Sequence, residues 1–159
     1  MKLFRALTVG LILAGPLAAQ DYYKGLAAWQ AGDYATALQE WLPLAEQGDV
    51  EAQFNLGFFY DSGNGVLQDY AEAVKWYRLA AEQGQADAQN NLGVMYANGE
   101  GVLQDAVLAH IWLNISGANG SALGSENRGK IEKIMTREQI ADAQALARRC
   151  MASNYQDCG

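Results

Sequence analysis

Residues 49–84 read DVEAQFNLGFFYDSGNGVLQDYAEAVKWYRLAAEQG, and residues 85–120 read QADAQNNLGVMYANGEGVLQDAVLAHIWLNISGANG. At a shift of 36 positions the two stretches share the Val-Leu-Gln-Asp run and identities at Ala52/Ala88, Gln53/Gln89, Asn55/Asn91, Leu56/Leu92, Gly57/Gly93, Tyr60/Tyr96, Gly63/Gly99, Gly65/Gly101, Ala73/Ala109, Trp76/Trp112 and Gly84/Gly120. So many identities at one shift do not arise by chance. The chain therefore contains a duplicated structural unit.

Each unit is predicted to form two helices. In the first helix of residues 49–84, apolar residues recur at helical spacing, at Ala52, Leu56, Phe59 and Tyr60. Gly63 and Gly65 end this helix, and Asp69 is placed to cap the second, with Glu72 at the capping-box position. The second helix ends at Gly84, and its apolar face consists of Ala73, Trp76, Tyr77 and Ala80. One hairpin cannot bury both apolar faces alone, so neighbouring hairpins are expected to stack into a solenoid.

The unit, with its Ala-x-x-x-Leu-Gly-x-x-Tyr and Gly-x-Gly-Val segments, resembles the Sel-one-like repeat, an αα-hairpin of the tetratricopeptide superfamily with a lengthened hairpin loop. This resemblance implies an all-α, right-handed αα-hairpin solenoid of about three hairpins with a C-terminal helical cap. The second copy departs from the first late, with Ser116 and Gly117 in place of Ala80 and Ala81. Looser helix packing is expected there.

The flanking segments are expected to extend this stack. Residues 20–48 resemble a divergent tetratricopeptide hairpin with a shorter turn, because Gly25 to Asp33 spans eight residues where Gly57 to Asp69 spans 12. In residues 121–159 we expect a helix that begins after Gly124 and a last helix from residue 137 to about 151, capped by Thr136. The solenoid is thus divided into residues 20–48, 49–84, 85–120 and 121–159.

The first 19 residues have the layout of a secretory signal peptide. Lys2 and Arg5 precede an apolar run, and the small pair Ala18-Ala19 favours cleavage after Ala19. The apolar stretch is shorter than the roughly 20 residues that a membrane-spanning helix needs, and Pro16 stands where a lipoprotein signal would carry Cys. The sequence therefore predicts a periplasmic or secreted protein without a stable membrane anchor after cleavage.

Charge and cysteine content narrow the range of partners and compartments. Loss of residues 1–19 would remove two of the 11 basic side chains and none of the 18 acidic ones, so the formal net charge would go from −7 to −9, which argues against nucleic acid as a partner. Cys150 and Cys158 both lie in the last ten residues, and in an oxidising compartment a disulfide between them is the simplest pairing. Free or intermolecular thiols are the alternative.

The residues that catalysis would require are scarce. His110 is the only histidine, and its position beside Ile111 and Trp112 indicates packing or an exposed edge. Some Sel-one-like relatives are cysteine-rich β-lactam-binding or hydrolysing proteins, but neither repeat contains Cys and the chain after Ala19 lacks Ser-x-x-Lys. The glycine-rich loops lack the Lys of a phosphate-binding loop. We therefore expect no catalytic residue, no metal site and no cofactor; a small envelope hydrolase, β-lactamase-like or cell-wall-acting, is the competing interpretation.

A candidate binding surface follows one side of the first helix in each unit. Its side chains recur at helical spacing, at Glu51, Asn55, Phe58 and Ser62 and then at Asp87, Asn91, Val94 and Asn98. In tetratricopeptide proteins these positions line a concave groove, and the Asn before Leu-Gly commonly binds the backbone of an extended peptide. The resemblance thus implies a scaffold that binds a peptide or protein segment, and the carboxylates of Glu51 and Asp87 favour a neutral or basic one. The alternative is that the two amides only brace neighbouring helices.

Overall fold

The computed structural model describes residues 15–156 and 158, and it gives the backbone alone for residues 15–20. These residues form an all-helical structure without strands, as predicted: α1 (Gly15–Gln30), α2 (Tyr34–Glu46), α3 (Val50–Ser62), α4 (Tyr70–Ala81), α5 (Ala86–Asn98), α6 (Ala106–Ala118), α7 (Ala122–Ile131), the short 3-10 helix η1 (Glu132–Ile134) and α8 (Arg137–Ala152). Most of the predicted signal peptide, residues 1–14, lies outside the described residues. Helix α1 continues through Ala19, after which cleavage is predicted.

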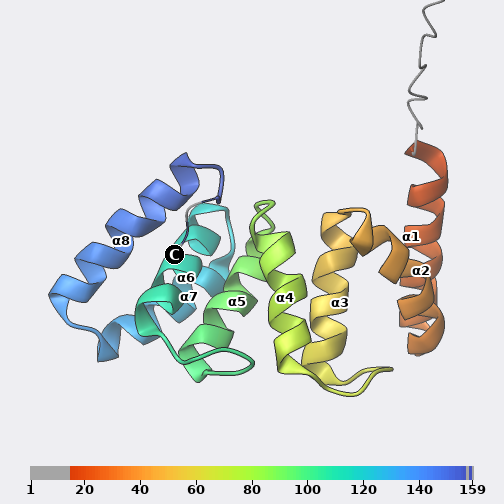
Figure 1. Ribbon diagram of the computed structural model, residues 1–159, viewed down its shortest axis with the longest axis horizontal. Helices are drawn as coiled ribbons and strands as arrows, with labels where there is room; N and C mark the ends of the chain where they lie inside the picture. The colour runs from red at the N-terminus through yellow and green to blue at the C-terminus, as the bar shows by residue number, and fades with distance from the viewer. Residues whose placement is uncertain (1–14, 157, 159) are drawn as a thin grey trace, which may run out of the picture.

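The helices stack as hairpins in chain order, from α1 at the right of Figure 1 to α8 at the left. From α1 to α7 each helix packs on the next one in the chain, and α5 also packs on α7 and α6 on α8. Each hairpin thus contacts its sequence neighbours, which is the organisation of a solenoid.

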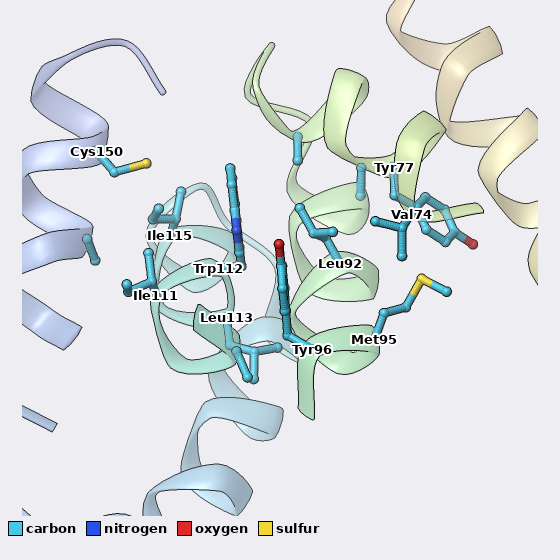
Figure 2. Packing of buried hydrophobic residues seen from close by; sticks show 14 of the residues in the cluster. Val74, Tyr77, Leu92, Met95, Tyr96, Ile111, Trp112, Leu113, Ile115 and Cys150 are labelled. Atoms are coloured by element: carbon cyan, nitrogen blue, oxygen red, sulfur yellow. The ribbon is translucent and has the colours of Figure 1, made fainter. Parts of the chain in front are cut away.

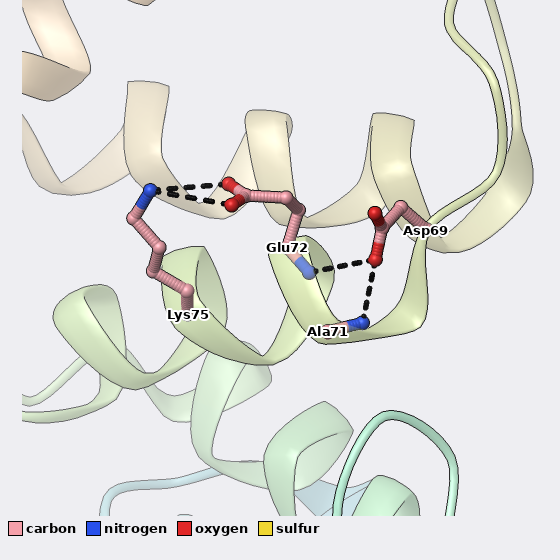
Figure 3. A network of polar contacts seen from close by, with 4 residues as sticks. All are labelled: Asp69, Ala71, Glu72 and Lys75. Atoms are coloured by element: carbon pink, nitrogen blue, oxygen red, sulfur yellow. Dashed lines mark hydrogen bonds and ion pairs between the residues drawn. The ribbon is translucent and has the colours of Figure 1, made fainter.

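Both repeat hairpins are shaped by the residues that the sequence singled out. The first helix ends at a left-handed residue, Gly63 in α3 and Gly99 in α5, with φ of 74° and 75°. The second begins at an aspartate: the Asp69 carboxylate accepts hydrogen bonds from the Ala71 and Glu72 backbone amides at 2.9 and 3.1 Å (Figure 3). Asp105 caps α6 in the same way.

One part of the predicted capping box is wrong. The Glu72 carboxylate does not return to the Asp69 backbone but pairs with Lys75, with 3.1 Å between Lys75 Nζ and Glu72 Oε2 (Figure 3). The Asp69 backbone amide already donates to the Tyr60 carbonyl at 2.9 Å, so the Glu72 carboxylate pairs with Lys75, one turn further along the helix. At α8 the predicted Thr136 cap is confirmed, and it forms a complete capping box with Gln139.

The Leu-Gly pair of each repeat creates space for the second helix. A Cβ at Gly57 would overlap the buried ring of Tyr77, and one at Gly93 would overlap Leu113. Gly25 has the same relation to Trp41 in the first hairpin. Figure 2 shows the side chains that fill the layers around α6, with Trp112 directed toward α5 and Ile111 and Ile115 toward α8. The core therefore depends on small residues in the first helices that face large ones in the second.

A repeated amide pair links the layers, and sequence reasoning did not assign it a role. The buried Gln53 side chain donates to the Ala45 carbonyl at 3.0 Å and accepts from Gln83 Nε2 at 2.8 Å. One repeat later, the buried Gln89 donates to a backbone carbonyl at 3.0 Å and accepts from Asn119 Nδ2 at 2.9 Å. Each glutamine thus satisfies buried polar groups at the junction between two hairpins.

The expectation of looser packing at Ser116 and Gly117 is wrong. Ser116 is buried, and its hydroxyl donates to the Ala86 carbonyl at 2.7 Å. A Cβ at Gly117 or Gly124 would collide with α7 or α6, respectively. The small residues therefore bring α6 and α7 close together. Helix α7 also begins before Gly124 rather than after it, because the Ser121 hydroxyl accepts a hydrogen bond from the Gly124 amide and caps the helix at Ala122.

The C-terminal tail folds back on the last repeat. Cys150, buried on α8, forms a disulfide with Cys158, as predicted. Between them, the Tyr155 hydroxyl accepts a hydrogen bond from Asn119 Nδ2 at 2.9 Å, and its ring lies over Gly84. The tail thus contacts the ends of both α4 and α6 and covers the exposed end of the stack.

Candidate functional site

The predicted binding residues lie on one face of the stack, formed by the first helices of successive hairpins: α1, α3, α5 and α7. We call it the first-helix face. Hydrogen bonds join its members side by side: Asn55 on α3 donates to the Tyr22 hydroxyl on α1 at 3.4 Å. On α7, Asn127 donates to the Asn90 side chain of α5 at 2.9 Å. These hydrogen bonds join α1 to α3 and α5 to α7.

The two asparagines of the Asn-Leu-Gly triplets are half-buried at the base of this face. Asn55 uses one donor on Tyr22, and its carbonyl oxygen has no hydrogen-bond donor within the described residues. The Asn91 carbonyl accepts from Nδ2 of Asn90, the preceding residue on the same helix, at 3.1 Å. Asn55 thus contacts a neighbouring helix, as the bracing alternative holds, but it retains an acceptor that a peptide N–H could use.

Phe58 contributes to an aromatic pocket between the first two hairpins, which we call the N-terminal pocket. It is 37% exposed and faces Trp29 of α1, which is 39% exposed. The pocket has a volume of about 300 Å³ and is lined by Trp29, Trp41, Phe54, Asn55, Phe58 and Phe59. The sequence did not identify Trp29 as a site residue, because its place depends on how the divergent first hairpin packs against α3.

Val94, 36 positions after Phe58, lies in a second pocket at the other end of the face, which we call the C-terminal pocket. Its volume is also about 300 Å³, and it is lined by Val94, Ala97, Asn98, Leu113, Asn127, Lys130, Ile131 and Ile134. Asn127 follows Asn55 and Asn91 at the same interval of 36. Extending the repeat period past residue 120 could have identified it, but the surrounding sequence has diverged.

Glu51 and Asp87 stand exposed on α3 and α5, one helical turn before the asparagines. Partial burial, followed by repulsion from Asp49 and Asp87, raises the pKa of the Glu51 carboxyl. Asp87 accepts a hydrogen bond from the Ser121 hydroxyl at 3.3 Å. Three carboxylates thus lie at the N-terminal ends of α3 and α5, which favours an approaching cation over an anion there.

The lone histidine has a packing role. His110 is fully buried, and its Nε2 lies 3.0 Å from Glu132 Oε1. The same carboxylate oxygen lies 3.4 Å from Arg128 Nε, and Arg128 donates to Asn114 at 2.8 Å. This cluster joins α6 to α7 and η1. Across the described ranges, no three His, Cys, Asp or Glu side chains gather to hold a metal ion.

Two solved structures have an architecture similar to that of this chain. A protective antigen of uropathogenic Escherichia coli strains that displays an SLR fold is 32% identical, with a TM-score of 0.81; the match covers 87% of this chain and 31% of that one. A Sel1 repeat protein from Oxalobacter formigenes is 33% identical, with a TM-score of 0.66, over 70% of this chain and 48% of that one. The chain thus spans less than half the length of either structure.

No curated protein matches the chain. The Sel1 repeat model matches residues 50–85 and 86–121, the same two units that the internal alignment delimits to within one residue. Sel1 repeat proteins are in general non-enzymatic scaffolds for protein–protein interaction. With two such repeats, the stacked hairpins and these structural relatives, residues 50–121 belong to the Sel1 repeat family.

Proposed function

We propose that this protein is an exported scaffold that binds an extended segment of a partner protein along the first-helix face. The observation that carries the proposal is the position of Asn55 and Asn91 at equivalent points on adjacent first helices, where Asn55 lines the N-terminal pocket and the C-terminal pocket begins one turn after Asn91, at Val94. An amide both donates and accepts, so it can pair with the backbone of a peptide of any sequence. The pockets would then receive side chains of the same segment.

The charge of the face supports a neutral or basic partner. Glu51 and Asp87 occupy the positions where a carboxylate-clamping tetratricopeptide domain would need Lys or Arg. An acidic segment would meet like charges here, which weakens binding and slows encounter. A basic segment would instead be attracted to these carboxylates and would relieve their mutual repulsion, which adds to partial burial in raising the pKa of Glu51.

Two observations support action in the cell envelope. The Cys150–Cys158 disulfide suits an oxidising compartment, and the first 19 residues resemble a secretory signal. None of the helices within the described residues is long and apolar enough to cross a membrane. The partner is therefore sought among envelope or secreted proteins.

The test is a peptide array probed with the purified protein, followed by affinity measurement on the peptides that bind. Replacing both asparagines, Asn55→Ala with Asn91→Ala, is expected to weaken binding about tenfold or more, because each removes hydrogen bonds to the peptide backbone. The matched control is Gln39→Ala with Gln144→Ala, two exposed helical amides away from this face. Unchanged affinity of the asparagine variant, at unchanged helicity, or a preference for acidic peptides, would refute the proposal.

A further inference from the structure

The N-terminal pocket is built almost entirely from aromatic rings. Trp41 and Phe59 are buried beneath it, with their ring centroids 5.5 Å apart. Trp29 of α1 and Phe58 of α3, 39% and 37% exposed, form its rim. Its volume of about 300 Å³ lies at the lower limit for ligand pockets, which suits one large side chain rather than a whole small molecule. Because aromatic rings pack favourably on one another, an aromatic side chain fits this pocket best.

Asn55 is the one lining residue of this pocket, among those the structure describes, whose side chain is not aromatic. Its Nδ2 donates to the Tyr22 hydroxyl at 3.4 Å, so its carbonyl oxygen remains the acceptor that an occupant can reach. A backbone N–H next to the inserted aromatic side chain would satisfy this oxygen. The pocket and the amide together therefore suit a peptide better than an isolated apolar molecule.

A carboxylate lies further along the same side of α3. Glu51 precedes Phe58 by seven residues, which is nearly two full helical turns, so both lie on one side of the helix, with Asn55 between them. At 1.5 Å per residue their Cα atoms are about 10 Å apart along the axis. Partial burial and then the charges of Asp49 and Asp87 raise the pKa of Glu51, and neither of these neighbours is basic. The order along α3 is therefore aromatic pocket, amide, carboxylate.

This order distinguishes the first two hairpins from the last. Asp61, one turn after Phe58, accepts a hydrogen bond from the Tyr77 hydroxyl of α4 at 3.3 Å, so its carboxylate is directed toward α4. The C-terminal pocket has no aromatic ring among its described lining residues, and it is lined by Lys130, which would repel a basic side chain. The groove between α1 and α3 is thus the place where an aromatic and a basic side chain are accommodated together.

The distance between pocket and carboxylate sets the spacing of the partner's side chains. In the polyproline II conformation, side chains three residues apart point the same way and lie about 9 Å apart, which matches the separation of Phe58 and Glu51. We infer that the partner carries an aromatic side chain for the N-terminal pocket and, three residues away, a Lys or Arg for Glu51, with a backbone N–H between them donating to Asn55. The inference rests on the proposed function and specifies its partner. These four residues contact α3, and the rest of the segment continues onto α5.

A synthetic peptide tests the motif directly. It is made in both chain directions with a fluorescein label, as Gly-Ser-Trp-Ser-Ser-Lys-Ser-Gly and Gly-Ser-Lys-Ser-Ser-Trp-Ser-Gly, and the tighter binder in a fluorescence-anisotropy titration is the parent. Replacing its tryptophan by serine is expected to weaken binding about tenfold or more, because the pocket is left empty. Replacing its lysine by glutamate is expected to weaken binding about threefold or more, because like charges meet. Moving the lysine next to the tryptophan keeps the peptide charge and is expected to weaken binding about threefold.

Protein variants then assign each side chain of the peptide to its site. In Phe58→Ala the exchange of tryptophan for serine should lose its effect, while the exchange of lysine for glutamate keeps its effect. Val94→Ala is the matched control, because it changes the equivalent residue of the next repeat, which lines the other pocket. Glu51→Gln is expected to abolish the preference for lysine over glutamate, and Glu138→Gln, an exposed carboxylate on α8, should leave it unchanged.

The outcomes separate this inference from the proposed function. Loss of the tryptophan effect in Phe58→Ala and of the lysine preference in Glu51→Gln, with both controls unchanged, supports the motif. If array peptides depend on the two asparagines but neither parent peptide binds, or Phe58→Ala leaves the tryptophan effect intact, the scaffold function stands and the motif is wrong. Equal binding of the lysine and glutamate peptides also overturns the motif. If Asn55→Ala with Asn91→Ala alters the binding of no peptide, both proposals fail.

Discussion

At the scale of single residues, the repeat is held together by pairs in which one member is small because the other is large. Gly57 and Gly93 occupy equivalent positions in α3 and α5, and each faces a bulky side chain of the following helix, Tyr77 or Leu113. The third member of this series, Gly129 in α7, has no atom within 4 Å of where its Cβ would lie. Identical residues at equivalent positions therefore have different physical roles.

This difference gives a matched pair of substitutions. Gly57→Ala is expected to destabilise the protein by about 1–3 kcal/mol, because the added methyl group meets the buried Tyr77 ring. Gly129→Ala is expected to stabilise it by about 0.5–1 kcal/mol, because alanine favours a helix interior and meets open space. Urea unfolding monitored by circular dichroism measures both. Effects of the same sign would contradict the packing described for α3 and α4.

At the scale of elements, the sequence predicted the helix boundaries inside the two repeats and missed one boundary beyond them. The helices of the two repeats follow from apolar spacing, the Gly63 and Gly99 ends and the Asp69 and Asp105 caps, and all of these are present. The early start of α7 at Ala122 was missed although Ser121 caps it at the position equivalent to Asp49 of α3 and Gln85 of α5, because the sequence around Ser121 has diverged from the repeat.

The residues of the candidate site could likewise be predicted only where they lie inside the two repeats. Phe58 and Val94 could be identified because helical spacing places them beside the asparagines, and both line pockets in the structure. Trp29 could not, because the divergent hairpin has no repeat register to relate α1 to α3. The partner of Asn55, Tyr22, likewise depends on the approach of α1 to α3, whereas Asn91 accepts from the preceding residue of its own helix.

The N-terminus of α4 offers a test of which contacts stabilise an element. Asp69→Ala is expected to cost about 1 kcal/mol, because two backbone amides lose their acceptor. Glu72→Ala is the control within the same turn: its partner Lys75 is an exposed charge, so the cost should be at most about 0.5 kcal/mol. Thermal unfolding compares the two. An equal cost for both would indicate that Glu72 acts as the capping box predicted and not as the ion pair seen in Figure 3.

At the scale of the whole molecule, each layer is stabilised mainly by its neighbours, so the ends of the stack determine how far local opening spreads. The C-terminal end is covered by α8 and by the tail that the disulfide holds against the last repeat. Tyr155 then reaches both Gly84 and Asn119, which itself bonds the buried Gln89. A covalent link eight residues long is thereby connected to the polar junction between the two repeats.

Loss of the Cys150–Cys158 disulfide should therefore destabilise mainly the C-terminal part of the stack. Cys150→Ser with Cys158→Ser is expected to lower the free energy of unfolding by about 2–3 kcal/mol, from the greater freedom of the unfolded tail. Because each layer contacts only its neighbours, amide hydrogen exchange should accelerate most in α6 and α8, while α2 and α3 keep their protection. Tyr155→Phe, which retains the disulfide and removes the hydrogen bond from Asn119, should weaken protection near Gln89 alone. Uniform acceleration from α2 to α8 in the cysteine variant would show instead that the stack unfolds as one cooperative unit, with stability shared equally between its ends.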